Sequence, residues 1–392
     1  MTRNRRLGRH GGIAPLTCVL LVAMLAMVAF AVDISWIALS QAELQNSADA
    51  AALAGANKLA DNYVLYTMPT QTTTNKATLR SGAVTAAKTA ARDYASYNTA
   101  GGATLVLLES DIDVGFTDSS GTFTSYTADS SKYPNTVKVA MRRDNGANTS
   151  LILFFAPVLG VSTMDLRAEA TATLYTATVT GFKSGSVNSG MLPLTFDVND
   201  WNNFIATGKD KLGTKSTDAS GNPILQIWAS INDTGNFGLL SLDDASGSAS
   251  TIRDWINNGA SPQDIKALED NNLIPVDKVT NSWDWKGSTG FKSSDAMDLN
   301  DKVGSTFMLP LFQPKVNTNG NYEAGVGNGT DYQYNIVAFV GIKIMRHPTN
   351  PQENREVWVQ PTIVSDPNAI LSNPTVADGS TFATSFTVKL TR

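Results

Sequence analysis

The pattern of hydrophobic and polar positions divides the chain into an apolar N-terminal run, an amphipathic stretch and a long remainder of short segments. Residues 13–32 are twenty positions without a charge. At about 1.5 Å of rise per residue, a helix of that length crosses a hydrocarbon core of roughly 30 Å. Pro15 falls in the first turn, where a missing N–H does little harm. The pattern therefore predicts a transmembrane helix over 13–36.

The helical pattern continues past the apolar run and becomes amphipathic. From Ile34 onward, mostly small residues recur at helical spacing and form one narrow seam. These are Leu44, Ala48, Ala51, Ala52, Gly55 and Leu59. Small side chains allow a second element to approach closely. The seam is interpreted either as a contact with a partner helix in an assembly or as packing onto the chain's own sheet, and we favour the second.

The remainder alternates in a way that predicts strands with a few helices. An Ala-rich stretch over 83–97 indicates a helix, and Gly101-Gly102 ends it. Strands are predicted over 104–108, 112–116, 122–127, 136–141 and 167–180, while the apolar run 150–159 has a helical pattern despite Pro157. Residues 37–180 are thus predicted to form an α+β layer against the extended N-terminal helix.

A Gly/Ser-rich stretch at 181–190 indicates a linker, followed by a second, β-rich extracytoplasmic domain over 191–392. Strands are expected over 225–231, 237–242, 336–345, 357–359 and 382–390, and short helices over 250–258 and 264–270. The tetrapeptide Met-Leu-Pro-Leu occurs at 191–194 and again at 308–311, which suggests two similar segments of one sheet. The predicted fold class is α+β throughout.

The distribution of charge sets the expected orientation. The segment 1–12 contains four arginines and no acid, and the first acid after it is Asp33. The positive-inside rule then predicts a cytoplasmic basic tail at 1–12, a single span in the inner membrane and an extracytoplasmic body. The alternative is a cleaved signal peptide with an A-x-A site at 29–31. We favour a retained anchor, because no polar region precedes that site. Asp33 itself pairs with a partner's cation or, as we prefer, is a solvated boundary residue.

Composition excludes several classes of function. Charged residues are only 17% of the chain and the net charge is -5, which argues against binding of nucleic acid. The single cysteine, Cys18, lies in the apolar run and permits no intrachain disulfide. Of the two histidines, only His347 lies beyond the basic tail. Without G-x-S-x-G or several histidines, we expect neither an enzyme nor a cofactor.

A resemblance to a known family rests on a long ordered string in the N-terminal half. It comprises the Arg-rich start, Gly12, Pro15, the Phe-Ala-Val-Asp exit at 30–33, Glu-Leu-Gln-Asn at 43–46 and Ala-Asp-Ala-Ala-Ala-Leu-Ala-Gly-Ala at 48–56. A second string is Phe-Phe-Ala-Pro-Val-Leu-Gly at 154–160, leading into the small-residue strand at 166–172. This pattern resembles the TadE/TadG-like proteins of Flp (tight adherence) pilus assembly. The resemblance implies an envelope component of a pilus-like system that contacts other pilus-assembly or pilin-like membrane proteins. The chain departs from the processed pilins in one respect, because no acid follows the glycines at 11–12 until Asp33, whereas the prepilin peptidase site has a glutamate a few residues after its glycine.

Three polar or aromatic patterns are candidates for binding. Asp244, Ser246 and Ser248 fit the D-x-S-x-S pattern of a metal-dependent adhesion site, where a carboxylate and two hydroxyls hold Mg²⁺. A Ser/Gly/Asp turn is the alternative, and we favour it. Acids and amides that could bind Ca²⁺, or could serve as turns and helix caps, gather at 197–200, 298–301 and 317–323. Trp283 and Trp285 form either a carbohydrate or peptide platform or, as we favour, a core or edge aromatic pair.

The leading hypothesis is therefore a non-enzymatic, membrane-anchored structural component of Tad/Flp pilus assembly or secretion. It would act through helix packing in the membrane and protein contacts outside it. The alternative is a cell-surface adhesion or binding protein, with or without a divalent cation. The sequence does not give the oligomeric state.

Overall fold

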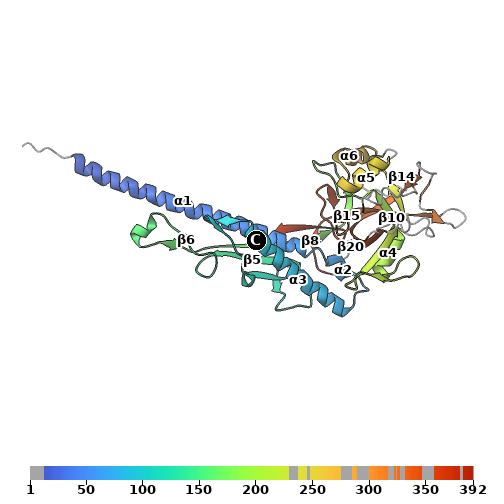
Figure 1. Cartoon of the computed structure of the whole chain (residues 1–392), viewed down its shortest axis with the longest axis horizontal. Coiled ribbons are helices and arrows are strands. Elements are labelled where there is room, and N and C mark those ends of the chain that lie inside the picture. The colour runs from blue at the N-terminus through green and yellow to red at the C-terminus, as the bar shows by residue number, and fades with distance from the viewer. Residues whose placement is uncertain are drawn as a thin grey trace, which may run out of the picture.

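The architecture is a long N-terminal helix that projects from a body of two sheets (Figure 1). The computed structural model describes residues 13–228, 237–244, 248–274, 285–288, 299, 301–316, 322–323, 325–326, 332–346, 357–379 and 383–391. The predicted α+β class is confirmed, with a long apolar helix, a mixed α/β layer and then β-rich sheets.

Helix α1 (Ile13–Lys58) is continuous over 46 residues, about 69 Å at the usual helical rise. Its N-terminal half stands free of the body, whereas its C-terminal half lies against α3 (Thr73–Ser96) and the first sheet. The helix ends at Lys58 in a turn that leads to α2 (Tyr63–Thr67). Helix α3 begins in the Thr/Asn-rich stretch before residue 79, because Thr72 caps it by accepting the N–H of Asn75 at 3.1 Å.

The first sheet is antiparallel and has the order β22-β8-β5-β3-β4, with β23 also paired to β8. Its strands are β3 (Ile112–Thr117), β4 (Phe123–Ser125), β5 (Thr136–Arg143), β8 (Leu166–Ala177), β22 (Thr375–Val376) and β23 (Ser385–Leu390). Alternation along β5 and β8 places alanines and branched residues under α1 and α3, and charged residues such as Lys138 on the opposite face. One face of the sheet is thus covered and the other is polar.

Smaller elements surround this sheet. They are β1 (Thr99–Ala100), β2 (Ala103–Thr104), η1 (Glu109–Asp111), β6 (Leu151–Ile152), η2 (Ala156–Leu159) and β7 (Thr163–Met164). The helix expected over 150–159 is wrong. That segment is a hairpin with a short 3-10 turn, because Pro157 and the left-handed Gly160 (φ 88°) interrupt any longer helix.

The second sheet has nine strands in the order β11-β12-β20-β19-β15-β10-β13-β14-β18. They are β10 (Leu194–Asp197), β11 (Ser216–Thr217), β12 (Pro223–Trp228), β13 (Phe237–Leu240), β14 (Trp285–Ser288), β15 (Thr306–Phe312), β18 (Tyr332–Tyr334), β19 (Ile336–Arg346) and β20 (Val357–Thr362). Helices α4 (Val198–Thr207), α5 (Ala249–Asn258) and α6 (Pro262–Asp270) pack around it through buried tryptophans and aliphatic residues. The pairs β9 (Val179–Phe182) with β21 (Ala369–Leu371), and β16 (Lys315–Val316) with β17 (Tyr322–Glu323), complete the described strands.

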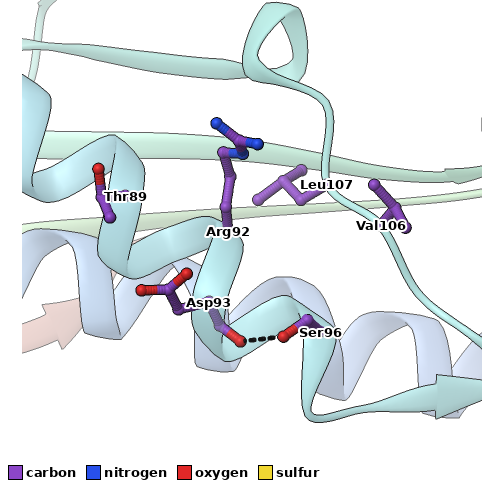
Figure 2. A pocket seen from close by; sticks show the side chains of 6 residues that line it. All are labelled: Thr89, Arg92, Asp93, Ser96, Val106 and Leu107. Carbon is purple, nitrogen blue, oxygen red and sulfur yellow. Dashed lines mark hydrogen bonds between the residues drawn. The ribbon is translucent and has the colours of Figure 1, made fainter.

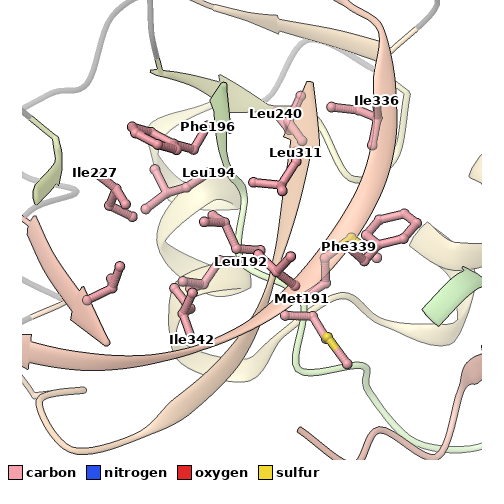
Figure 3. Close-up of a cluster of buried hydrophobic side chains, with 14 of the residues drawn as sticks. Met191, Leu192, Leu194, Phe196, Ile227, Leu240, Leu311, Ile336, Phe339 and Ile342 are labelled. Carbon is pink, nitrogen blue, oxygen red and sulfur yellow. The ribbon is translucent and has the colours of Figure 1, made fainter. Parts of the chain in front are cut away.

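The first Met-Leu-Pro-Leu tetrapeptide leads into β10, and the second lies within the neighbouring strand β15. Strand β10 runs parallel to β15, with Phe196 opposite Leu311, and Met191 forms a parallel bridge to Met308. Their side chains meet in the core of the second sheet (Figure 3). The repeated tetrapeptide therefore marks the parallel pair of an otherwise antiparallel sheet.

The segment 181–190 is held in place by specific hydrogen bonds, although its composition predicts a loose linker. Gly181 and Phe182 pair with β21. Ser189 exchanges backbone hydrogen bonds with Ala260, and its hydroxyl donates to Asp366 at 2.8 Å. The buried Asp366 carboxylate also accepts the N–H of Gly190 at 2.7 Å. Small residues here serve close packing between the two sheets.

Candidate functional site

Helix α1 has two chemically different halves. From Ile13 to Val32 its large apolar side chains are 41–78% exposed, and none of the most apolar window is buried within the chain. This is the one helix in the described part of the chain that is long and apolar enough to cross a membrane. Burial begins at Asp33 and recurs along the side that faces the body. The helix thus changes environment at a single point.

Asp33 lies at that point and is only 4% exposed. Its two carboxylate oxygens accept the backbone N–H groups of Phe154 at 2.8 Å, Phe155 at 3.0 Å and Ala156 at 2.7 Å. We expect a solvated boundary residue or a partner's counter-ion from the sequence, and the burial of Asp33 contradicts the first of these. Asp33 instead joins α1 to the β6–β7 hairpin through three charge-assisted hydrogen bonds.

An apolar groove lies between α1 and this hairpin. The Trp36 and Phe154 rings pack with centroids 5.6 Å apart. The groove has a volume of about 440 Å³ and is lined by Val28, Ala31, Val32, Ser35, Trp36, Leu39 and Phe154. The hairpin therefore lies beside the last turns of the apolar half of α1.

The hairpin itself, residues 151–164, presents an apolar surface to its surroundings. It contains no charged residue. Its large side chains are strongly exposed, with Val158 at 88% and Ile152 at 70%, followed by Leu159, Phe154, Val161, Phe155 and Met164. An exposed apolar cluster of this size marks an interaction surface more often than an ordinary loop. The sequence pattern showed the apolar run but not its exposure.

The small-residue seam of α1 is used inside the chain. All six predicted residues are buried. A Cβ added at Gly55 would stand 3.0 Å from the carbonyl oxygen of Ala87 on α3 and 3.2 Å from the Val137 side chain on β5. Leu44, Ala48 and Leu59 belong to the core of the first sheet. The structure thus places the seam against the chain's own α3 and sheet.

Two glutamines of α1, which the sequence analysis overlooked, close an edge of the first sheet. Gln41 donates to the carbonyl of Arg167 at 2.8 Å, and Gln45 donates to that of Glu169 at 2.9 Å. The next outward carbonyl, that of Thr171, accepts from Thr391 at 2.8 Å. The two amide side chains thus continue the row of hydrogen bonds where β23 ends.

The D-x-S-x-S candidate has other roles where it can be described. The Asp244 carboxylate accepts from the Asn271 amide at 2.9 Å and forms a 3.5 Å ion pair with Lys286. Ser248 caps α5 by accepting the N–H of Thr251 at 3.2 Å. Ser246 lies outside the described residues. The described residues contain no group of three or more His, Cys, Asp or Glu side chains that could hold a metal.

Some of the other polar and aromatic candidates have structural roles, and the rest lie outside the described residues. Asp197 caps α4 through the N–H of Asn199 at 2.7 Å, and burial raises the pKa of Asp197 to about 6. Trp285 is buried and its indole N–H donates to the carbonyl of Leu273 at 3.2 Å, as a core residue. Several members of these groups lie outside the described residues: Trp283, Asp284, Asp298, Asn300, Asn317, Asn319, Asn321 and His347.

A second cavity of about 380 Å³ lies beside the C-terminal end of α3 (Figure 2). It is lined by Thr89, Arg92, Asp93, Ser96, Val106 and Leu107. The Ser96 hydroxyl donates to the Asp93 carbonyl at 2.7 Å, an ordinary helix-end contact. One arginine and one aspartate among mostly uncharged neighbours do not form a catalytic arrangement.

Comparison with known proteins gives two family matches. Residues 11–58 match the family model described as putative Flp pilus-assembly TadE/G-like, and residues 38–172 match that described as putative Tad-like Flp pilus-assembly. No curated protein and no solved structure matched the chain. The two matches overlap within α1 and together contain Asp33, the seam, the hairpin and most of the first sheet. Over residues 11–172, the chain is therefore similar to the TadE/G-like and Tad-like Flp pilus-assembly families.

Proposed function

We propose that this protein is a non-enzymatic, membrane-anchored component of Flp pilus assembly or secretion. Its first twelve residues lie in the cytoplasm, α1 crosses the inner membrane once, and the two-sheet body is extracytoplasmic. The observation that carries the proposal is the division of α1 within the family-matched region. One half exposes only uncharged, mostly apolar side chains, and the other is built into the body.

The division of α1 also indicates which surface is available to other pilus components. The seam residues are already occupied by α3 and the first sheet. Helix packing with a partner therefore falls to the apolar half, residues 13–32. In a membrane such packing depends on side-chain shape, because lipid tails are as apolar as the helix. The partners implied are other Tad membrane components.

The test begins with deletion of the chain in its host and complementation with a C-terminally tagged copy. Pili are counted by electron microscopy and surface attachment is measured. Carbonate extraction and protease accessibility in spheroplasts locate the body. We expect loss of pili on deletion, an extraction-resistant protein and a protease-accessible tag. Normal pili and attachment without the protein would overturn the proposal.

A matched variant separates anchoring from specific helix packing. Residues 13–32 are replaced by an unrelated transmembrane segment of equal length and similar hydrophobicity. We expect the variant to remain anchored and yet to fail in pilus assembly. Full complementation by this variant would show that the span only anchors the body, and would refute specific packing within the membrane.

A further inference from the structure

We propose that the β6–β7 hairpin, residues 151–164, inserts its apolar tip into the extracytoplasmic leaflet of the same bilayer that α1 crosses. The protein would then be anchored in the membrane at two places, by the α1 span and by a monotopic loop. This inference rests on the proposed placement of α1 and goes beyond it, because a single span requires no second contact.

Position is the first argument. Figure 1 shows the hairpin extending from the body along α1, toward the N-terminal end of the helix. Phe154 lines the groove together with Val28 and Val32, which belong to the apolar half of α1. If residues 13–32 occupy the hydrocarbon core, the hairpin reaches the level at which that core ends. Its exposed apolar surface is therefore continuous with that of the span.

The chemistry of the tip is the second argument. Val158 and Leu159, which are 88% and 65% exposed, stand at the turn, and the charged residues nearest along the chain lie outside the hairpin, at Asp144 and Asp165. Amphipathic elements lie in a membrane interface with their apolar side about 5–10 Å deep. Trp36 and Phe154, packed together at the base, are suited to the boundary itself.

The third argument is that most backbone N–H groups of the tip already have partners. Backbone N–H and C=O groups without partners are costly in lipid, so each one that is paired favours insertion. Within residues 153–161, seven N–H groups donate hydrogen bonds: those of 153, 158, 160 and 161 within the hairpin, and those of 154, 155 and 156 to Asp33. Pro157 has no N–H to satisfy. The same three hydrogen bonds supply the Asp33 carboxylate with donors at the membrane edge.

Among possible occupants of this surface, the bilayer fits better than a partner helix. A partner helix would cover one face of α1, whereas the exposed side chains of the hairpin extend from its strands, at Ile152 and Met164, to its turn, at Val158 and Leu159. The bilayer needs no added component, since the proposed span brings the lipid to the hairpin. The occupant is therefore the lipid interface, and a protein partner becomes an outcome of the test.

The experiment uses the full chain with Cys18→Ser and one new cysteine at a time, labelled with an environment-sensitive fluorophore. The positions are Val158→Cys at the tip, Leu25→Cys in the span and Ser120→Cys in an exposed turn distant in sequence. The protein is reconstituted alone, at less than one copy per vesicle, into phosphatidylcholine–phosphatidylglycerol vesicles. Quenching by aqueous iodide is compared with quenching by lipids that carry a spin label in the acyl chain.

We expect the probes at Val158 and Leu25 to be quenched by the labelled lipid and protected from iodide several-fold relative to Ser120. If Leu25 is lipid-quenched and Val158 is quenched by iodide like Ser120, the hairpin inference is overturned while the anchor stands. If Leu25 is also open to iodide, the proposed placement of α1 fails first. If Val158 is protected only when native membranes with pilus components are used, a protein partner covers the hairpin and the lipid assignment is wrong.

Discussion

At the scale of single residues, Asp33 connects elements far apart in sequence. Its partners lie 121–123 positions downstream, and all three are backbone N–H groups. Such donors cannot be recognised in a sequence, because every residue except proline has a backbone N–H group. The helix pattern therefore placed Asp33 at the membrane edge but gave no means of finding its partners.

Replacing Asp33 with asparagine tests this connection. Asparagine retains one acceptor oxygen but loses the charge and the second acceptor, so at least one of the three N–H groups loses its partner. We expect amide hydrogen exchange in residues 153–156 to become several-fold faster in lipid nanodiscs, with little change in the first sheet. Asp49→Asn, which alters another acid of α1, is the control and should leave the hairpin unchanged. Equal exchange in both variants would contradict the role assigned to Asp33.

Asp197 gives a prediction about pH. Burial raises its pKa to about 6, and the neighbouring charge of Asp200 acts in the same direction. The folded state binds the carboxyl proton of Asp197 more tightly than the unfolded state does. The contribution of protonated Asp197 to the free energy of unfolding is therefore fully present below about pH 4 and is lost as the pH rises through about 6. Asp197→Asn keeps a cap and should stabilise the protein at pH 7 by on the order of 2 kcal/mol, with no gain at pH 4.

Thermal unfolding of the full chain in detergent, measured from pH 4 to pH 7, checks this prediction. Asp118→Asn is the comparison, because hydrogen bonds from Ser120 and Thr122 lower the pKa of Asp118. The effect of Asp118→Asn should therefore have the opposite sign, with stability lost when the carboxylate is removed near neutral pH. A constant gain for Asp197→Asn at every pH would contradict the assigned pKa.

At the scale of elements, glycines on α1 and α3 provide a matched pair. A Cβ added at Gly55 would lie 3.0 Å from a backbone carbonyl oxygen. A Cβ added at Gly82 would have only the Asn62 side-chain amide nearby, at 3.9 Å. Gly55→Val should lower stability by about 1–3 kcal/mol through overpacking. Gly82→Ala should raise it by up to about 1 kcal/mol through helix propensity. Denaturant unfolding of the two variants measures both changes, and destabilisation of similar size would contradict close packing at Gly55 alone.

Elements with a strong local period could be predicted from the sequence. The twenty uncharged positions and the alanine seam specify α1, and the alternation after Leu166 specifies β8. Apolar runs without a clear period were ambiguous, so residues 150–159 suggested a helix where the chain forms a hairpin. The pairing of β10 with β15, more than 100 residues apart, depends on tertiary contacts that no local pattern contains.

At the scale of the whole molecule, the two sheets are joined by more than one crossing of the chain. Leu65 and Met68 of the helical layer belong to the core of the second sheet. Strand β21 pairs with β9 between the sheets, and the chain then returns to the first sheet as β22 and β23. The family-matched region ends at residue 172, yet its sheet is completed by strands beyond residue 374. The chain therefore passes between the two sheets again after the predicted linker at 181–190.

Removal of residues 372–392 tests this dependence. The truncation leaves the edge of β8 unpaired from Ala172 to Ala177 and takes Phe386, Ala377 and Ala383 out of the first core. We expect a loss of at least about 3 kcal/mol, the lower value for removal of one buried phenylalanine, with faster proteolysis of β8 and less protein in the membrane. A chain that ends at Leu390 keeps all six residue pairs between β23 and β8 and is the control. If the longer truncation melts like the control, the family-matched region folds without its C-terminal strands. If it unfolds while the control does not, the first sheet depends on strands that follow the second sheet in the chain, because an uncovered strand edge and an open core cannot be compensated within residues 11–172.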